Sequence, residues 1–545
     1  MKNRLILSMV LMLAASYPVL ACTNFIVGKA ASTDGSVIVS YSADSYGNFG
    51  TLYHFPAATH EINAMRDIYE WDTGKFLGKI KEAPQTYNVI GNMNEFQVTI
   101  GETTWGGRPE LQDPNGLIDY GSLIYVTLQR SRSAKEAIKI MTDLVKEYGY
   151  YSSGESFSIA DPDEACMLEM IGEGPDKKGA VWIAVRIPDD CIAAHANQSR
   201  IHQFNMNDKD NCLYSPDVIS FAREKGYFDG LNKDFSFADA YNPLDWGGLR
   251  YCDARVWSFF NHHVSGMDRY LPWALGKDKD AEDMPLWVIP DKKLSVADVM
   301  ADMRDHFEGT PMAIDSTDMG GGIWQMPYRP TPLYFKVDGK KYFNERPTST
   351  QQTSWSYVSQ MRSWLPREMG GCFWFGNDDG NMVAYTPIYC SMTRRPECYN
   401  TPGADELNFS DRNAYWVENW VSNMVYPRYS MLFPSLKVVR DSLQQAYFDQ
   451  QPDIEAKARQ MQPAEMSKFL NDYSVEQAQR MLARWRQLAF YLVVKYNDMA
   501  VKPEENGRFT RSKYGLGATV KRPGFPVTYA RRLVKETGDR YLIPE

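Results

Sequence analysis

A leader-like segment followed at once by a cysteine is the feature that most constrains this chain. The leader starts with two basic residues, continues with an apolar run over 5–15 and ends in Val19-Leu20-Ala21, a small-residue pattern typical of signal peptidase sites. Cleavage after Ala21 makes Cys22 the first residue of the mature chain. We predict that residues 1–21 are a signal peptide and that the protein is exported, periplasmic or secreted.

A cysteine at a mature N-terminus carries a thiol and a free α-amine on adjacent carbons. Their ordinary pKa values, roughly 8.5 and roughly 8, make the pair a nucleophile with its own base near neutral pH. Two other interpretations stay open. Lipoprotein processing also needs a cysteine at this place, although Val19 and Leu20 match its signal poorly. Cys22 could also be a buried or disulfide-bonded structural residue.

The length and net charge of the chain limit the number of domains and the kinds of partner that it can have. Removing 21 of the 545 residues leaves 524, enough for one large domain or several ordinary ones. The formal charge of −9 becomes −11, because the leader takes two basic residues and no acidic one. This acidic balance argues against nucleic acid as a partner. No run of about 18 apolar residues follows the leader, so we predict no membrane span.

The remaining cysteines and the histidines give no metal or cofactor motif. Cys390 with Cys398, or Cys191 with Cys212, could form disulfides in an oxidising compartment, but spacing does not decide connectivity. His262-His263 is the one histidine pair, and adjacent residues on a strand would point to opposite faces. We therefore predict no metal site and no cofactor.

The first mature residues have the pattern of a β-hairpin. Strand-like segments over 23–28 and 36–41 flank turn residues at 31–35. This hairpin places Cys22 at its open end, with residues 41–44 within reach of the thiol.

Further along, strands alternate with helices. Ser133 begins a capping-box pattern followed by an apolar stripe up to Tyr148, and strand patterns resume over 156–196. The pattern becomes helical past Pro434, where Ser474 begins a second capping-box pattern. We predict an α+β fold with antiparallel sheets.

Three polar residues are candidates to assist the Cys22 thiol. Asp44 could hold the α-amine of the nucleophile or of a substrate, Asn197 could donate to an oxyanion, and Arg255 could supply a cation. Each also has an ordinary structural interpretation, as a turn aspartate, a turn asparagine and a paired or stacked arginine.

Several sequence blocks resemble the C69 family of cysteine dipeptidases. They include the mature N-terminus from Cys22 to Gly28, and they occur in order up to about residue 200. The other blocks are Ala31–Ser36, Gly91–Glu95, Ile100–Thr104, Tyr148–Tyr150, Gly154–Phe157, Ile159–Ala165 and Val181–Asn197.

The resemblance implies a fold and a set of site residues. The family is similar in its core to penicillin V acylases and bile salt hydrolases, which are N-terminal nucleophile hydrolases with a four-layer αββα sandwich. It implies Cys22 as nucleophile with its α-amine as base, Asp44 as the aspartate beside the nucleophile, and Asn197 as the oxyanion asparagine. Arg255 matches a late arginine of the acylase relatives.

The sequence departs from the family pattern at two places. Many relatives carry an arginine where this chain has Tyr41. Either Arg255 or another basic group supplies the cation near the thiol, or the thiol stays less acidic. The acylase relatives also have an asparagine on the oxyanion side, about ten residues after the position of Asn94. The corresponding place in this chain is near Thr104, which could make a polar contact, and Glu102 and Thr103 could equally line the pocket.

We therefore expect three regions and one activity. Residues 1–21 form the signal peptide, 22–433 the catalytic domain, and 434–545 a mostly helical segment packed on it. We expect a cysteine dipeptidase that acts on short peptides, is matured by signal peptidase without self-processing, and binds substrate through Tyr41, Asn94, Glu102 and Thr103.

Some alternatives stay open at this stage. Asp44 or Glu102 could hold the ammonium group of the substrate. A related amidase acting on N-acyl, bile-salt or penicillin-like amides and a lipid-anchored, non-catalytic surface protein are the competing functions. The sequence also leaves open a homo-oligomer.

Overall fold

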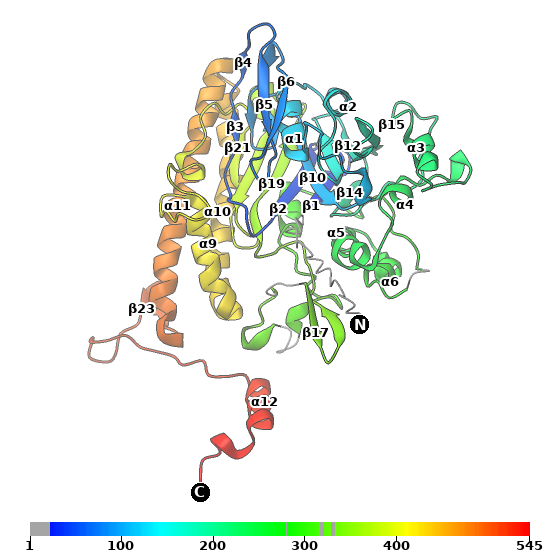
Figure 1. The fold of residues 1–545 in the computed structure, drawn as a ribbon. Coiled ribbons are helices and arrows are strands. Elements are labelled where there is room, and N and C mark those ends of the chain that lie inside the picture. The colour runs from blue at the N-terminus through cyan, green and yellow to red at the C-terminus, as the bar shows by residue number, and fades with distance from the viewer. Residues whose placement is uncertain (1–21, 279–280, 317–320, 329–332) are drawn as a thin grey trace, which may run out of the picture.

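A computed structural model describes residues 22–278, 281–316, 321–328 and 333–545. The predicted signal peptide lies outside the described residues. Two large antiparallel sheets form the centre, and helices surround them (Figure 1). The α+β prediction is therefore confirmed.

The first sheet contains the predicted N-terminal hairpin. Strands β1 and β2 pair from Thr23 opposite Ser42 to Val27 opposite Ile38, as the sequence pattern predicts. The strands of this sheet, in spatial order, are β16 (Trp287–Val288), β14 (Ile192–His195), β1 (Thr23–Val27), β2 (Val37–Asp44), β19 (Thr353–Met361), β20 (Cys372–Asn377) and β21 (Thr386–Tyr389).

The second sheet is built mainly from the segment between residues 89 and 214. Its strands, in spatial order, are β15 (Cys212–Tyr214), β13 (Ala180–Ile187), β12 (Ala165–Gly172), β11 (Gly154–Ala160), β10 (Thr99–Trp105), β9 (Met93–Asn94), β8 (Val89–Ile90) and β3 (His54–Phe55). Small two-stranded sheets are formed by β4 (Ala58–Thr59) with β7 (Gln85–Thr86), β5 (Met65–Tyr69) with β6 (Phe76–Lys81), β17 (Tyr334–Val337) with β18 (Lys340–Phe343), and β22 (Glu504–Glu505) with β23 (Arg508–Phe509).

The two large sheets contact each other through β1 and β2 of the first sheet and β10 and β11 of the second. Gly101 on β10 permits this close approach, because a Cβ there would lie 2.3 Å from Asn24 Oδ1 on β1. The Asn24 amide donates to the carbonyl of Glu102 at 2.6 Å and fixes the register between the sheets. The first residues of the mature chain are thus held against β10.

Helices contact both large sheets. Helices α1, α2 and α3 contact the second sheet, whereas α5, α7, α8, α9, α10 and α11 contact the first (Figure 1). The helices are α1 (Tyr120–Leu128), α2 (Ala134–Tyr148), α3 (Val218–Glu224), α4 (Phe237–Tyr241), α5 (Ala254–His263), α6 (Leu271–Ala274), α7 (Val296–Asp302), α8 (Arg367–Gly370), α9 (Ala414–Val425), α10 (Tyr429–Ala458), α11 (Pro463–Tyr496) and α12 (Val527–Thr537).

One of the two predicted helix starts is confirmed. Helix α2 begins after Ser133, whose hydroxyl accepts from the Glu136 N–H at 3.2 Å. The start predicted at Ser474 is wrong, because Ser474 lies in the middle of α11 and its hydroxyl accepts from the Tyr389 N–H. The same spacing of serine and glutamine occurs inside a helix when the serine faces a neighbouring strand.

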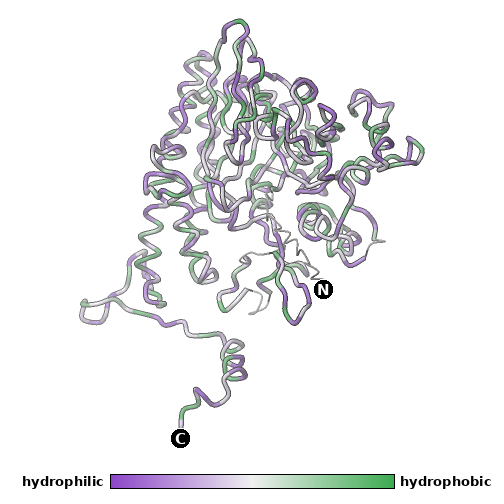
Figure 2. Tube along the Cα trace, in the orientation of Figure 1, coloured by the Kyte–Doolittle hydropathy of each residue, from purple (hydrophilic) through white to green (hydrophobic). Residues whose placement is uncertain are grey.

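The C-terminal part contains two long helices and a more exposed end. Helices α10 and α11 pack against β21 and against each other, and α11 buries Trp485 completely. Pro434 lies inside α10. Helix α12 has no buried residue, and Figure 2 shows both hydrophobic and hydrophilic residues along this last segment.

The described residues contain no helix with the length and apolar character needed to cross a membrane. All eight cysteines are among the described residues, and all are buried free thiols. Neither of the two disulfides considered from spacing is therefore formed in this structure.

Candidate active site

Cys22 lies at the start of β1 and faces the other sheet. Its side chain is buried, and Sγ lies 3.6 Å from both the Tyr41 hydroxyl and Glu102 Oε1. The Tyr41 hydroxyl donates to the same Glu102 oxygen at 2.8 Å. The structure thus brings together the predicted nucleophile and two of the predicted binding residues.

The surroundings of Cys22 disfavour a thiolate in the full-length chain. Burial raises the pKa of the Cys22 thiol well above its ordinary value, and the carboxyls of Glu102 and Asp44 raise it further. A hydrogen bond with the Asp44 backbone lowers that pKa in part. In this chain the nitrogen of Cys22 is part of a peptide bond, so no ammonium charge stands beside the thiol.

Asp44 is paired with an arginine that the sequence analysis did not identify. Its carboxylate forms a buried ion pair with Arg346 and accepts from the Thr353 hydroxyl at 2.7 Å. Arg346 also lies close enough to Arg255 to lower the pKa of that guanidinium. Arg346 is paired with Asp44, and the pKa of the Cys22 thiol remains well above its ordinary value.

Breaking this ion pair should destabilise the fold. Replacing Arg346 with methionine leaves the Asp44 carboxylate buried without its cation, so we expect a loss of about 3–5 kcal/mol in the free energy of unfolding. Urea denaturation measures this change. The double variant Asp44→Asn with Arg346→Met should recover part of the loss, and equal stability of Arg346→Met and the parent would contradict the prediction.

Arg255 joins the nucleophile strand to the end of β14. Its Nη1 donates to the Cys22 carbonyl at 2.6 Å and to the Thr23 hydroxyl at 2.7 Å. Its Nη2 donates to the Ala196 carbonyl at 3.1 Å and to Asn197 Oδ1 at 2.9 Å. Burial and Arg346 lower the pKa of Arg255 to about 10, which leaves the guanidinium charged at neutral pH. A π-helical turn (Gly248–Asp253) directly precedes α5 and this residue.

Asn197 lies at the same sheet end as Cys22. Strand β14 pairs with β1 with His195 opposite Asn24, and two more steps of this register bring Asn197 level with Cys22. Asn197 adopts a left-handed conformation with φ 62°, which asparagine tolerates better than most residues and which ends the strand. Its side-chain amide donates to the Thr104 carbonyl at 2.7 Å. Asn197 therefore ends the strand, as its turn interpretation predicts, and it also lies near the nucleophile.

Replacing Arg255 with lysine tests the positioning role of this arginine. Lysine keeps the charge but lacks the planar fork that reaches Cys22 and Asn197 together. If the expected dipeptidase activity is present, kcat should fall by about 10- to 100-fold with little change in KM, because misplacement of reacting groups acts on the chemical step. Steady-state kinetics measure kcat and KM separately. A change in KM alone would contradict a positioning role.

Two further carboxyl groups interact with Glu102: that of Glu155, which is buried, and that of Asp72, which lies in an exposed turn. The Glu155 carboxyl lies against that of Glu102 and accepts from the Thr104 hydroxyl at 2.7 Å. Asp72 is near enough to raise the pKa of both, and it accepts from the Tyr120 hydroxyl at 2.9 Å. Burial raises the pKa of Glu102 to about 7 and of Asp72 to about 6, and it raises that of Glu155 well above its usual value. We call Asp72, Glu102 and Glu155 the carboxyl cluster.

Two predicted binding residues do not join this cluster. The Asn94 amide donates to the carbonyls of Leu128 and Ser131, both at 2.8 Å, and so holds a turn. Thr103 follows Glu102 on β10 and is directed away from it, and its hydroxyl contacts His195 Nδ1 at 2.7 Å. Neither residue contacts Cys22, because the polar groups of both are occupied in the core.

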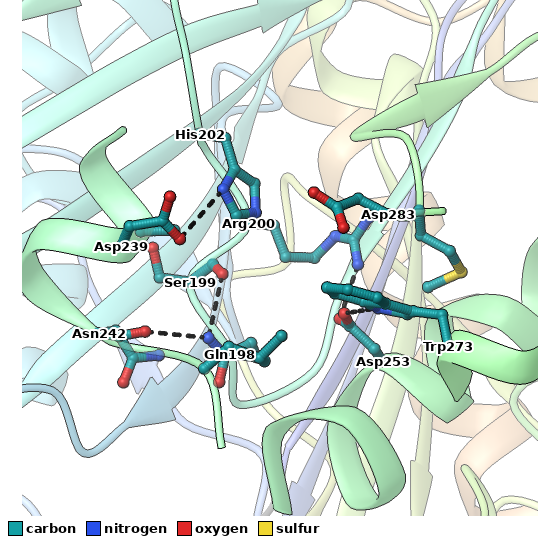
Figure 3. Close-up of a pocket in the computed structure, with 12 residues that line it drawn as sticks. Gln198, Ser199, Arg200, His202, Asp239, Asn242, Asp253, Trp273 and Asp283 are labelled. Atoms are coloured by element: carbon teal, nitrogen blue, oxygen red, sulfur yellow. Dashed lines mark hydrogen bonds and ion pairs between the residues drawn. The ribbon is translucent and has the colours of Figure 1, made fainter. Parts of the chain in front are cut away.

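A small cavity adjoins the site (Figure 3). Its walls include Gln198, which follows Asn197, and Asp253, which precedes Arg255 by two residues. Asp253 accepts from Arg200 at 2.7 Å and from the Trp273 indole at 2.8 Å. The cavity volume of about 10 Å³ has room for about one water molecule and none for a peptide. Its ion pair supports the segments that carry Asn197 and Arg255.

The histidine pair lies on a helix rather than on a strand. His262 and His263 end α5, and both contact the Asp302 carboxylate, at 3.0 and 2.8 Å. The strand assumption was wrong, because adjacent helical residues share a broad face. Across the described ranges, no group of three or more histidine, cysteine or acidic side chains is arranged to hold a metal ion.

Comparison with known proteins gives a family match and several relatives. Residues 21–55 and 48–441 match the family model Peptidase family C69, so the match includes Cys22 and ends within α10. A protein named "Probable dipeptidase" from Salmonella dublin is 28% identical over 396 residues, which cover 69% of this chain and 82% of the relative.

Two other relatives are more distant. A protein named "Probable dipeptidase" from Latilactobacillus sakei is 24% identical, with 75% of this chain and 82% of the relative covered. "Probable dipeptidase B" of Streptococcus pyogenes serotype M1 is also 24% identical, with 74% and 78% covered. The family match spans most of the chain that carries the site.

Proposed function

The chain belongs to peptidase family C69, and from this premise we propose that it is an exported cysteine dipeptidase with Cys22 as its N-terminal nucleophile. The chain is a hydrolase of that family, and its relatives are named as probable dipeptidases. The observation that best supports the proposed site is the position of Cys22. Its buried thiol lies beside Glu102, and Arg255 holds its carbonyl and the Asn197 amide together.

The proposed fold class is that of the N-terminal nucleophile hydrolases. Two antiparallel sheets in contact, with helices against each, agree with the four-layer αββα sandwich of that class. We propose residues 22–433 as the catalytic domain and 434–545 as an additional C-terminal segment. The end of the family match at residue 441 supports a boundary in this part of the chain.

The proposed reaction starts with removal of the leader by signal peptidase. The new α-amine stands beside a thiol whose pKa the surroundings otherwise raise. In its neutral form this amine accepts the thiol proton through a water molecule, and the resulting ammonium group stabilises the thiolate, which attacks the peptide carbonyl. No self-cleavage is needed, because signal peptidase already exposes the nucleophile.

Stabilisation of the oxyanion, protonation of the leaving amine and hydrolysis of the thioester complete the proposed reaction. Backbone N–H groups and the Asn197 amide stabilise the oxyanion, and Arg255 orients that amide through its Oδ1. The leaving amine takes the proton from the N-terminal amine, and water then hydrolyses the thioester. Tyr41 and Glu102 contact the thiol, and we propose that the substrate binds on this side. The proposed reaction uses no metal and no organic cofactor.

A substrate panel tests this function against the related amidase activity. Unblocked dipeptides should be hydrolysed by the mature protein, whereas glycine conjugates of bile acids and penicillin-like amides should be hydrolysed at least about 100-fold more slowly. The opposite preference would assign the protein to the amidase activity. Hydrolysis of neither class by the mature chain would contradict catalysis and favour a binding protein.

A further inference from the structure

We propose that the carboxyl cluster of Asp72, Glu102 and Glu155 binds the α-ammonium group of the peptide substrate. This inference rests on the proposed function and adds the chemical class of the substrate, namely peptides with a free N-terminus. The cluster holds that amine beside Cys22, so that the first peptide bond is presented to the thiol.

The cluster begins at the nucleophile and extends away from it. Glu102 Oε1 is 3.6 Å from Cys22 Sγ, and the Glu155 carboxyl lies against Glu102 on the neighbouring strand β11. Asp72 lies on the side of Tyr120, the first residue of α1. A substrate amine held by Glu102 lies close to the thiol, and one residue of an extended peptide spans about 3.5 Å. This distance suits cleavage after the first residue.

The two glutamate carboxyls lie within hydrogen-bond reach of each other, but each has one oxygen that no other group of the described residues contacts. Oε2 of Glu102 and Oε2 of Glu155 are buried and accept no hydrogen bond from an N–H or O–H group of the described residues. Glu102 is 2% exposed and Glu155 is fully buried. Burial of a carboxylate is costly without a partner, and an ammonium group with three N–H donors supplies one.

The cluster also lacks a basic partner of its own. Among the described residues, no lysine, arginine or histidine forms an ion pair with Asp72, Glu102 or Glu155. Asp44 differs, because Arg346 already neutralises it. Of the two acidic residues considered from the sequence, Glu102 is therefore the one that is available to a substrate ammonium, and Asp44 is not.

The amine of Cys22 alone does not account for the cluster. Cleavage of the leader adds one amine, whereas the cluster contains three carboxyl groups. Only Glu102 contacts Cys22, so Glu155 and Asp72 are left for a second positive charge. The raised pKa values of all three groups agree with a site that is incomplete without a cation.

Aromatic side chains pack around Trp71, the residue before Asp72. Trp71 stacks on Tyr125 with ring centroids 4.6 Å apart, and Tyr53 packs on Trp71 at 4.7 Å. Such rings favour a cation and an apolar side chain next to it. They suit the first residue of a peptide substrate.

The substitution Glu155→Gln tests the inference without changing a group that touches Cys22. The substrates are one dipeptide and its N-acetylated form. We expect kcat/KM for the free dipeptide to fall at least about 30-fold, mainly through KM, because one member of a buried charge pair is lost. The slow hydrolysis of the N-acetylated form should change less than about threefold.

The substitution Glu418→Gln is the matched control. Glu418 lies on α9, is fully buried and also has unpaired carboxylate oxygens, but it lies outside the carboxyl cluster. It should leave the preference for the free amine unchanged. Equal losses for both substrates in Glu155→Gln would overturn the inference and assign Glu155 to support of the nucleophile. Unchanged kinetics in that variant would also overturn it.

A binding measurement separates this inference from the proposed catalysis. The mature Cys22→Ala protein should bind the free dipeptide at least about 30-fold more tightly than the N-acetylated form in a calorimetric titration. Equal affinities would contradict the ammonium site even if the wild-type protein is a dipeptidase. A preference for the free amine in a protein that hydrolyses no peptide would instead support the site and contradict the proposed function.

Discussion

Replacing Cys22 with alanine is expected to lower kcat/KM for a dipeptide by about 10⁴-fold or more. The thiol is the group that attacks the carbonyl in the proposed reaction, and removal of a nucleophile leaves only the contributions of binding and oxyanion stabilisation. The fold should persist, because alanine at the start of β1 removes a single sulfur atom. Hydrolysis of a dipeptide, followed by amine release, measures the loss.

Cys212 provides the control for this substitution. It is also a buried free thiol, at 5% exposure, but it lies on the edge strand β15 of the other sheet. Cys212→Ala should keep activity within about twofold of the parent. A Cys22→Ala protein that keeps more than a tenth of the parent activity would contradict the nucleophile assignment.

A mature chain that retains Ala21 before Cys22 is expected to lose about 10²- to 10⁴-fold in kcat, the usual contribution of a general base. In that chain the nitrogen of Cys22 is a peptide nitrogen and accepts no proton. The burial of the thiol and the nearby carboxyls of Glu102 and Asp44 then keep its pKa raised. The rate of alkylation by iodoacetamide, measured against pH, should show a higher pKa for Cys22 than in the chain that starts at this residue.

The matched control for this second prediction carries one extra alanine after Glu545. It has the same composition as the extended chain but leaves the α-amine of Cys22 free. Its activity should equal that of the parent. If the chain with Ala21 were as active as the parent, the α-amine would not be the base, and a side chain near Cys22 would have to take that role.

The hairpin at the nucleophile could be predicted because its determinants are local. Alternating apolar residues over 23–28 and 36–41 and the turn between them are sufficient to define β1 and β2. The position of Asp44 near Cys22 follows from this pairing. The same local logic failed at Ser474, where a start pattern lies inside a 34-residue helix. Local capping signals do not show whether a serine faces solvent or a neighbouring strand.

The long-range parts of the site could not be derived from local pattern. Arg346 pairs with Asp44 across 302 residues, from a segment where no regular pattern marks it. Glu155 meets Glu102 only because β10 and β11 pair with Thr104 opposite Glu155. Arg255 and Asn197 were indicated by the family resemblance, and the structure shows the contact that joins them. Tertiary packing brings these charged residues together. The spacing of apolar and polar residues along one sequence does not show which distant segments will meet.

The N-terminal sequence and intact mass of the protein exported by its native host test the central claim most directly. The account predicts a chain that starts at Cys22 with a free α-amine and an unmodified thiol. A chain that starts at another residue, or a mass that shows a diacylated Cys22, would contradict it, because either result removes the nucleophile or its base.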